Sequence, residues 1–427
     1  MIGYQENFAR ASEANPDRIC WRETMELFRG ESSFRLTFAE VMGRALYAPD
    51  GYYGSGNAQP GKAGDFYTSV STGSCFGFLL ARHVAETWIR LERPDPFYLV
   101  EAGAHDGQLL LDVLGGIQDC QPDLIPLLRL VTIEPSPALA KLQEDRLTGQ
   151  KWKTYPDLDS LARSWSSSDS VKSVAFIANE LLDAFPVHRV RKNTGKWEEA
   201  WVTGRPGDGE IKNCGDGNAL IPDQSMQNSE FQVSKSPNLQ VSLSLDYAEL
   251  SSESLREAIS ELEGRLITPL PEGYETEICL ASTHWVRQFA NLPWQGSALF
   301  LDYGFEEDDY YHPDRTSGTL RRYFQHRSDE RFLENLSKAD LTADVDFSSI
   351  MRAAKEGDLS VCGFTDQHHF LTRIGQEWLM SFEGRPTLGM NSMLRQFRTL
   401  THPGLMGRAF KVLGLCRGLS ADGWKGF

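Results

Sequence analysis

The chain has little positive charge and no long apolar run. Its 427 residues include 43 Lys and Arg against 59 Asp and Glu, which leaves a formal net charge of −16. A nucleic-acid-binding protein normally presents a basic face to the phosphates. No stretch of about 18 apolar residues occurs, so no transmembrane helix is expected. We therefore expect neither nucleic-acid binding nor membrane insertion.

Cysteine is scarce and shows no metal-binding spacing. The seven cysteines are odd in number, and no two of them have a C-x-x-C spacing. This argues against both a disulfide framework and a zinc site. The first 18 residues mix Glu, Asp and Arg, unlike the apolar core of a signal peptide or the acid-poor character of a transit peptide. The sequence thus predicts reduced thiols, no bound metal and a cytoplasmic location.

The composition is that of a globular enzyme. Hydrophobic residues make up 41% of the chain, and 23 Phe and 10 Trp can fill a sizeable core. At roughly 150 residues per domain, the length allows two or three domains.

A strand–helix alternation begins near residue 97. Short apolar runs at 97–100, 128–133 and 173–178 are typical of buried strands, and helices are expected between them at 108–117 and 136–146. This alternation predicts a parallel, doubly wound sheet, which is the Rossmann-like class of α/β fold.

Other elements surround this pattern. Thr37 and Glu40 form a capping box at the start of an amphipathic helix over 37–48. The Ser-rich stretch 160–172 is expected as an exposed loop, and the apolar-poor stretch 203–237 as an insertion. Further helices are expected at 75–91, 343–356, 366–374 and 390–400 and as a pair within 251–292, and further strands at 298–301 and 410–415.

A glycine-containing turn follows the first expected strand. It begins with Glu101 and contains Gly103 and Gly107, which permit a tight turn and close approach of a ligand to the backbone. The helix that follows offers free N–H groups. The G-x-x-x-G spacing differs from the G-x-G-x-x-G of dinucleotide sites. Glu101 suits a ligand with a positive end, such as the amino group of S-adenosylmethionine, while a purely structural turn is the alternative.

Acidic residues also follow the next two strands. Glu134 would lie at the sheet edge where ligands bind, and it can accept both hydroxyls of a ribose. An acid favoured by a helix dipole is the alternative. Asn179, Glu180 and Asp183 follow the third strand. Carboxylates there can orient an amine or guanidinium or act as a general base, unless they are only surface acids of a capped loop.

A loop upstream of the sheet contains Gly64, Thr68 and Ser69. Its glycine and hydroxyl groups are consistent with a loop that folds over a ligand, and equally with an ordinary Asx or Ser turn.

Together these motifs resemble the MidA family of S-adenosylmethionine-dependent methyltransferases. The mitochondrial members of that family assist the assembly of respiratory complex I by methylating an arginine of a subunit. The resemblance spans about residues 37–416, and the stretch ADLTADVDF is its most specific part. The matching blocks occur in family order at 47–53, 64–69, 101–107, 134–143, 179–188, 301–304, 318–320, 326, 340–347, 364–371, 402–403 and 406–407.

The resemblance implies a class I methyltransferase fold with added N-terminal helices and inserted helical and hairpin elements. It implies S-adenosyl-L-methionine as cofactor and a protein arginine nitrogen as methyl acceptor, and it leaves a homodimer open. Glu180 would orient the acceptor nitrogen, with Asp183 and Asn179 as further catalytic residues. The cofactor-binding residues that it implies are Gly64, Asp65, Phe66, Thr68, Ser69, Glu101, Gly103, Asp106, Gly107, Glu134 and Asn179.

The resemblance also suggests one elaborated catalytic domain in four parts. These are N-terminal helices with a cofactor-covering loop (1–92), a cofactor-binding α/β core (93–202), an insertion with a helical substrate side (203–297), and a C-terminal completion of the domain (298–427).

Two departures from the family pattern keep other functions open. Ala104 and His105 replace the Pro and middle Gly of the family's G-P-G-x-G loop, and Val70-Ser71 replaces a Pro-Glu pair. The alternatives are a cofactor-binding assembly or scaffold protein without transferase activity and a methyltransferase of another acceptor. A nicotinamide-dependent oxidoreductase is a third, against which the missing third loop glycine argues.

Overall fold

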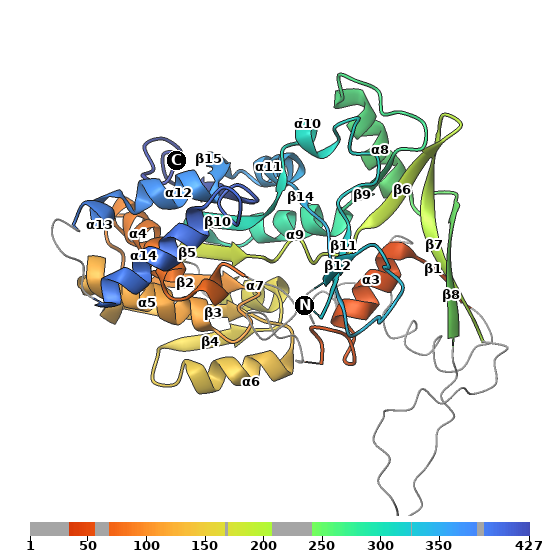
Figure 1. Ribbon diagram of the computed structural model, residues 1–427. Coiled ribbons are helices and arrows are strands. Elements are labelled where there is room, and N and C mark those ends of the chain that lie inside the picture. Colours follow the sequence, from red (N-terminus) through yellow and green to blue (C-terminus); the bar gives the residue numbers. More distant parts are fainter. Residues whose placement is uncertain (1–33, 56–67, 167–169, 207–240, 326, 382–387) are drawn as a thin grey trace, which may run out of the picture.

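The structure is a computed structural model that describes residues 34–55, 68–166, 170–206, 241–325, 327–381 and 388–427 (Figure 1). Two sheets organise it. The large lobe is built around an eight-stranded sheet, and the small lobe around a five-stranded antiparallel sheet.

The large sheet is doubly wound, as predicted. Its strand order is β15 (Ser360–Asp366), β16 (Phe410–Arg417), β10 (Trp294–Phe305), β5 (Lys172–Asn179), β2 (Phe97–Ala102), β3 (Leu128–Ile133) and β4 (Trp152–Tyr155), with β14 (Val345–Asp346) beside β10. Strands β10 to β4 are parallel, and β16 is antiparallel to both of its neighbours. The chain winds from β2 to β3 and β4 on one side and resumes at β5 and β10 on the other. The switch point therefore lies between β2 and β5, where open α/β sheets bind ligands.

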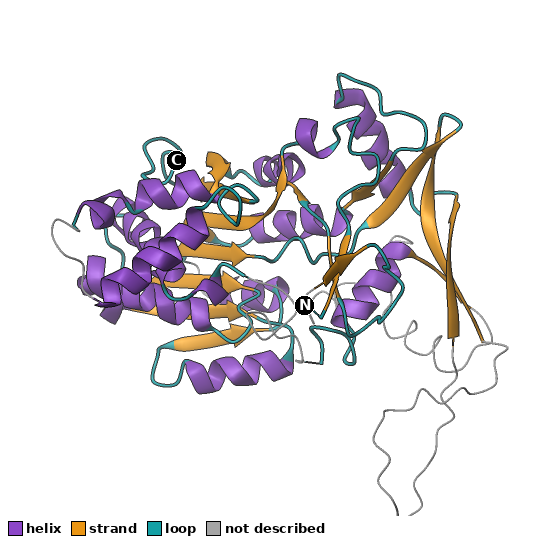
Figure 2. Cartoon of the chain, viewed as in Figure 1, coloured by secondary structure: helices purple, strands orange, loops and turns teal. Residues whose placement is uncertain are grey.

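Helices cover both faces of this sheet, which makes three layers (Figure 2). Adjacent residues of one strand contact opposite cores: Leu99 packs with the first group of helices and Val100 with the second, as the two-residue period of a strand requires. The first group is α4 (Cys75–Arg90), α5 (Gln108–Cys120), α12 (Gln367–Ile374) and α14 (Leu388–Thr401), and the second is α7 (Leu158–Ser166), α9 (Leu280–Ala290) and α11 (Phe347–Glu356). Helix α6 (Pro137–Arg146) connects β3 to β4.

The small lobe is mostly an insertion between β5 and β10. Its sheet consists of β1 (Phe34–Thr37), β7 (Lys196–Pro206), β6 (His188–Asn193) and β9 (Glu275–Ile278), with β8 (Val241–Ala248) beside β7. Helices α8 (Glu253–Arg265) and α3 (Phe38–Tyr47) pack on it. The expected capping box of α3 is confirmed, because Glu40 N donates to Thr37 Oγ1 at 3.2 Å and Thr37 N donates to Glu40 Oε2 at 2.6 Å.

Short elements complete the chain between β10 and β16. They are α10 (Glu307–Tyr310), a small sheet of β12 (Arg327–Asp329), β11 (Arg321–Phe324) and β13 (Asp340–Thr342), and α13 (Gln376–Met380).

The structure differs from the sequence expectations in two segments. The Ser-rich stretch 160–172 was expected as an exposed loop, and this is wrong for its first half: α7 buries Leu158, Leu161 and Trp165, whose i, i+3, i+7 spacing marks one helical face. The expected boundary between residues 202 and 203 falls inside β7, which pairs with β8 from Glu199 to Pro206. Residues 207–240 lie outside the described ranges.

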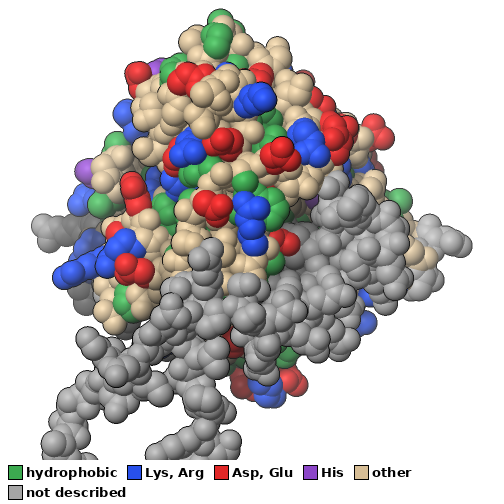
Figure 3. Space-filling view, turned by 90° about the vertical axis from the view of Figure 1, so that its right-hand side faces the viewer, with side chains coloured by type: hydrophobic (Ala, Val, Ile, Leu, Met, Phe, Trp, Pro, Cys, Tyr) green, Lys and Arg blue, Asp and Glu red, His purple; other side chains and the backbone are tan. Residues whose placement is uncertain are grey.

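The surface on the small-lobe side carries both signs of charge in close alternation (Figure 3). Ion pairs on this sheet include Arg191 with Glu198 at 2.9 Å and Arg35 with Asp246 at 3.3 Å. Within the described ranges, no helix is long and apolar enough to cross a membrane.

Candidate functional site

Acidic side chains gather at the carboxyl edge of the large sheet. The strands β2, β3, β5 and β10 all end on the side that faces the small lobe (Figures 1 and 2). Glu101 lies near the end of β2, Glu134 follows β3 and Glu180 follows β5. Asp302 of β10 lies one residue beyond Leu301, which is paired with Asn179. Parallel strands thus bring four acids from distant parts of the sequence to one edge.

Glu101 is buried, with 4% of its surface exposed. Its Oε2 accepts no hydrogen bond from any described residue. Burial, together with the negative charges of Asp106 and Glu134, raises the pKa of Glu101 to about 8. An unpartnered buried oxygen is costly, and this one is available to a ligand that enters the site.

The turn after β2 depends on left-handed backbone conformations. Gly103 has φ 70° and Gly107, the N-cap of α5, has φ 79°. A Cβ at residue 103 would lie 3.0 Å from Leu181 Cδ1, in a conformation that side chains rarely adopt. His105, which replaces a family glycine, also has positive φ (45°), and its carbonyl accepts a 2.8 Å bond from Gln143 Nε2. The side chain at 105 therefore does not prevent the turn from forming.

Asp106 is already engaged within the protein. Its carboxylate accepts a bond from Gln108 N at 3.1 Å and pairs with Arg146 at 3.0 Å. Burial opposes ionisation of Asp106, but hydrogen bonds from His105 and Gln108 outweigh it and lower the pKa. The structure thus gives Asp106 a role in holding the turn.

Glu134 lies at the start of α6, as the helix-dipole alternative from the sequence requires. Its Oε1 accepts a bond from Ser136 N at 3.0 Å, and Ser136 is the N-cap of α6. Its Oε2 lies 3.5 Å from Gln143 Nε2, a long contact that leaves this oxygen weakly satisfied. Burial raises the pKa of Glu134 to about 7, although the bond from Ser136 lowers it.

Glu180 meets the end of the upstream loop. Its Oε1 accepts bonds from Ser69 N at 3.0 Å and from Asn179 Nδ2 at 3.1 Å. Its φ of 48° is unusual for a residue other than glycine and is a form of strain found at functional sites. Loss of solvation and the charge of Asp183 raise the pKa of Glu180 to about 8. Asn179 Oδ1 is buried and has no partner in the described part of the chain.

Asp302 holds the segment after Glu180, a role that the sequence did not reveal. Its Oδ2 accepts backbone N–H bonds from Leu181 (3.1 Å), Leu182 (2.8 Å) and Asp183 (3.3 Å). Burial and the nearby Asp183 charge raise the pKa of Asp302, and burial raises the pKa of Asp183 to about 7. The available signal was an Asp directly after the apolar strand 298–301, in a block that matched the family.

Two tyrosines and a further acid lie beside this segment. The rings of Tyr47 and Tyr53 stack with centroids 5.8 Å apart, and Tyr53 OH donates to Asp340 Oδ1 at 2.9 Å. Tyr47 OH donates to the carbonyl of Ala184. Burial is the main cause that raises the pKa values of Tyr47 and Tyr53. The negative charges of Asp340 and Asp183 raise both pKa values further. Aromatic faces and carboxylates together suit a cationic group.

The structure brings Ser69, Glu101, Gly103, Glu134, Asn179, Glu180 and Asp183 to this edge. Thr68 instead closes a local turn, with its Oγ1 accepting from Ser71 N at 3.0 Å, which matches the Ser-turn alternative. Gly64, Asp65 and Phe66 lie outside the described residues.

The edge fits S-adenosylmethionine. The free carboxylate oxygen of Glu101 can receive the ammonium group, the weakly satisfied oxygen of Glu134 can receive ribose hydroxyls, and the glycine turn admits close contact. A doubly wound sheet with its reversed strand β16, this turn and these acids define a class I S-adenosylmethionine-dependent methyltransferase.

Comparison with known proteins supports the assignment to the S-adenosylmethionine-dependent methyltransferases. A family model described as S-adenosyl-L-methionine-dependent methyltransferase matches residues 79–365. The chain belongs to this family, the MidA family of methyltransferases. It is therefore an S-adenosylmethionine-dependent methyltransferase, as expected, rather than a nicotinamide-dependent oxidoreductase.

Similar proteins cover most of the chain. The mitochondrial protein arginine methyltransferase NDUFAF7 homologue of Drosophila melanogaster is 28% identical over 90% of this chain and 82% of its own length. The mitochondrial protein arginine methyltransferase NDUFAF7 of Danio rerio is 27% identical over 89% and 83%. A Burkholderia thailandensis crystal structure with bound S-adenosyl-homocysteine has a TM-score of 0.71, with 23% identity over 98% of this chain and 94% of that chain, and shows the same fold.

The expected cytoplasmic location is wrong by this comparison. The relatives from Drosophila melanogaster, Danio rerio and Xenopus tropicalis are all named as mitochondrial proteins. The expectation rested on the composition of the first residues, which is a weak indicator of location.

Proposed function

We propose that this methyltransferase acts on an arginine nitrogen of a protein. The observation that carries the proposal is the set of carboxyls Glu180, Asp183 and Asp340 beside the rings of Tyr47 and Tyr53 at the sheet edge. A guanidinium is planar, always charged and able to donate several bonds, so it suits carboxylates and aromatic faces. The names of the relatives support the same acceptor.

Cofactor binding is proposed for the residues nearer β2 and β3. Glu101 would hold the ammonium group and Glu134 the ribose hydroxyls, while Gly103 and Gly107 let the backbone approach. The loop ending at Ser69 would cover the methionine part, because Ser69 N is already anchored to Glu180. Gly64, Asp65, Phe66 and Thr68 remain predictions for the same loop.

The chemistry that bound S-adenosylmethionine supplies is a methyl group on a sulfonium. The protein's own task is alignment, because in-line attack gains most from correct positioning. Glu180 would orient the attacking nitrogen, held in place by Asn179 and the backbone of Ser69. The nitrogen loses a proton on methylation, and the ionised form of Glu180, whose pKa is about 8, can accept it. Asp183 would hold the other side of the guanidinium.

The test is methylation with radiolabelled S-adenosylmethionine and a protein extract, followed by amino-acid analysis of the labelled band. Label in methylarginine that disappears with Glu180→Ala supports the proposal, provided that the variant still binds S-adenosyl-homocysteine. Label in lysine or only in small molecules would contradict arginine as the acceptor. Equal loss of binding and turnover would contradict the role given to Glu180.

A further inference from the structure

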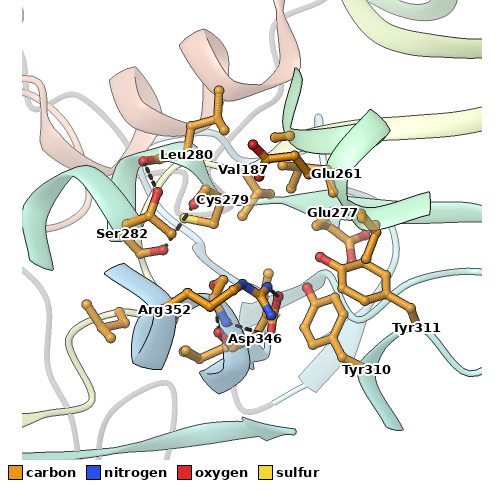
Figure 4. A pocket seen from close by; sticks show the side chains of 18 of the residues that line it. Val187, Glu261, Glu277, Cys279, Leu280, Ser282, Tyr310, Tyr311, Asp346 and Arg352 are labelled. Atoms are coloured by element: carbon orange, nitrogen blue, oxygen red, sulfur yellow. Dashed lines mark hydrogen bonds and ion pairs between the residues drawn. The ribbon is translucent and has the colours of Figure 1, made fainter. Parts of the chain in front are cut away.

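A cavity lies beside the candidate site. It is a pocket of about 340 Å³ between α8, α9, the end of α10 and α11 (Figure 4). Leu182 and Ala343 form part of its wall, and Ala343 N donates to the carbonyl of Asp183 at 2.9 Å. The pocket is thus adjacent to residues 180–183, which include the acids proposed to bind the methyl acceptor. None of the residues proposed to bind the cofactor lines it. Its volume suits a ligand of about amino-acid size.

The charges of the pocket favour a cation. Its lining contains six acids and three arginines: Glu257, Glu261, Glu277, Asp344, Asp346, Glu356, Arg265, Arg287 and Arg352. The arginines are already paired. Arg287 lies 2.6 Å from Glu356, while Arg265 and Arg352 lie 3.0 and 2.7 Å from Glu307. Four of the acids are paired as well, among them Asp344 with Arg321 at 3.0 Å. Glu257 and Glu277 form no ion pair with a described residue, and their negative charge remains available to a positive ligand.

One carboxylate oxygen in the pocket is unsatisfied. Glu277 is 1% exposed, and its Oε2 accepts bonds from Thr319 N at 2.8 Å and Thr319 Oγ1 at 3.2 Å. Its Oε1 accepts no bond from the residues that the structure describes. Figure 4 shows Glu277 beside Tyr310 and Tyr311, whose ring centroids are 4.7 Å apart. A buried carboxylate with one free oxygen next to two aromatic rings is a receptor for an N–H-bearing cation.

We propose that this pocket binds a guanidinium or primary ammonium group, with Glu277 as its principal acceptor and Tyr310 and Tyr311 as its aromatic wall. Such a group has two sources: a free amino acid or amine, and a basic side chain of the acceptor protein outside the methylated residue. Only the second source rests on the proposed protein substrate. In both cases the site is distinct from the edge where methyl transfer is proposed.

The first experiment measures binding of labelled L-arginine by equilibrium dialysis, with L-lysine and L-citrulline as competitors. Citrulline matches arginine in shape but carries no side-chain charge. We expect lysine to compete and citrulline not to compete. Glu277→Gln should weaken arginine binding about tenfold, because it removes one charge-assisted hydrogen bond. Glu180→Gln is the matched control and should leave this site intact, whether or not arginine residues are the methyl acceptor.

Glu277→Gln retains an oxygen that can accept the bonds from Thr319, so we expect it to fold, and thermal melting checks this. Glu257→Lys places a positive charge on an exposed lining position of α8 and provides a second variant whose folding is not at issue. It should also weaken arginine binding. Absence of arginine binding to the wild-type protein, unchanged binding in both variants, or equal competition by citrulline would overturn the proposal.

The second experiment distinguishes the two sources in the methylation assay. A Glu277→Gln variant with raised KM for the acceptor protein and unchanged kcat assigns the pocket to a basic side chain of that protein. Unchanged KM, together with the loss of free arginine binding, assigns it to a small cation. Failure of the protein to methylate arginine would contradict the proposed function, yet it would leave the binding result standing.

Discussion

Glutamate side chains occur in two very different environments in this molecule. In the small lobe, Glu198 pairs with Arg191 at 2.9 Å and Glu199 with His188 at 2.7 Å. The hydrogen bond from Arg191 lowers the pKa of Glu198, and partners of Glu199 outweigh the effect of its burial and lower its pKa as well. At the edge of the large sheet, burial instead raises the pKa values of Glu101 and Glu180 to about 8.

The difference separates structural from functional charge. A paired carboxylate is satisfied by its own fold and has little left to offer a ligand. A buried carboxylate without a cationic partner costs folding free energy, and it remains available to a cation that arrives later. Burial alone does not set the direction of the pKa shift, since Glu199 is fully buried and still has a lowered pKa. The direction of the shift depends on whether the carboxyl has a cationic or hydrogen-bonding partner that outweighs the effect of burial.

The largest effect is expected at Glu180. Glu180→Gln preserves shape and removes the charge and the proton acceptor, so kcat should fall about 10²- to 10⁴-fold. Steady-state methylation kinetics measure it, and affinity for S-adenosyl-homocysteine should change little. Glu198→Gln on β7 is the matched control in the small lobe. A variant at Glu180 that keeps more than about half of wild-type kcat would remove the distinction between the two settings.

Glu134 should show the next largest effect. Glu134→Gln removes the charge from bonds to the ribose hydroxyls and should weaken cofactor binding about 10- to 100-fold, which corresponds to about 1.5–3 kcal/mol. Calorimetric titration with S-adenosyl-homocysteine measures this. Glu144→Gln, an exposed change on α6, serves as the control. Equal affinities of the two variants would assign Glu134 only to the start of α6.

The pH dependence should have opposite signs for folding and for binding. In the unfolded chain a Glu has a pKa of about 4.3, whereas Glu101 has about 8 in the folded protein. The folded state holds this proton more tightly, so the contribution to stability is present at low pH and is lost as pH rises from about 4.3 to 8. Cofactor affinity should instead increase as pH rises through about 7 to 8, because Glu134 and Glu101 ionise there.

Urea unfolding of the free protein between pH 5 and about 9, with Glu101→Gln beside the wild type, tests the folding part. The variant should be more stable than the wild type at the high end and should show a flatter profile. Titrations of S-adenosyl-homocysteine over the same range test the binding part. A cofactor affinity that does not change with pH would show that neither carboxyl ionises on binding.

The smallest effect is expected for the paired charges. Glu198→Gln removes a partly exposed ion pair with Arg191 and should change the free energy of unfolding by no more than about 1 kcal/mol. Methylation kinetics should not change. Denaturant unfolding and the kinetic assay together measure both, and a large loss of activity would mean that the small-lobe sheet contributes more than a scaffold.

The local elements were largely readable from the sequence. The apolar runs around 97, 128 and 173 and the capping box at Thr37 are patterns of neighbouring residues, and they predicted β2, β3, β5 and α3. The family resemblance implied inserted hairpin elements, but the positions of β6, β7 and β8 were not predicted. β6 and β7 are adjacent in the sequence, whereas β1, β8 and β9 pair with them from more distant parts of the chain, so the stability of this sheet depends on long-range pairing.

The sequence predicted which acids lie at the sheet edge, but it did not predict which of them are paired or how their pKa values are shifted. Glu101, Glu134 and Glu180 could be proposed because each follows a strand, and the carboxyl ends of parallel strands meet at one edge. Asp302 was not given a role, because its three backbone donors lie about 120 residues earlier in the chain. The ion pair of Asp106 with Arg146 was not predicted either, and the assignment of Asp106 to the cofactor stays a prediction.

The sequence by itself determined the class of fold and the acids at the sheet edge, because strands, turns and the residues that end them are local features, and its family resemblance identified the cofactor. Only the tertiary structure decided which acids of the chain are paired. Glu199 and Glu101 cannot be told apart by residue type, yet one meets His188 and the other meets no cation among the described residues. The ionisation of a carboxyl depends on solvation and on charges within a few ångströms, and those neighbours come from the fold.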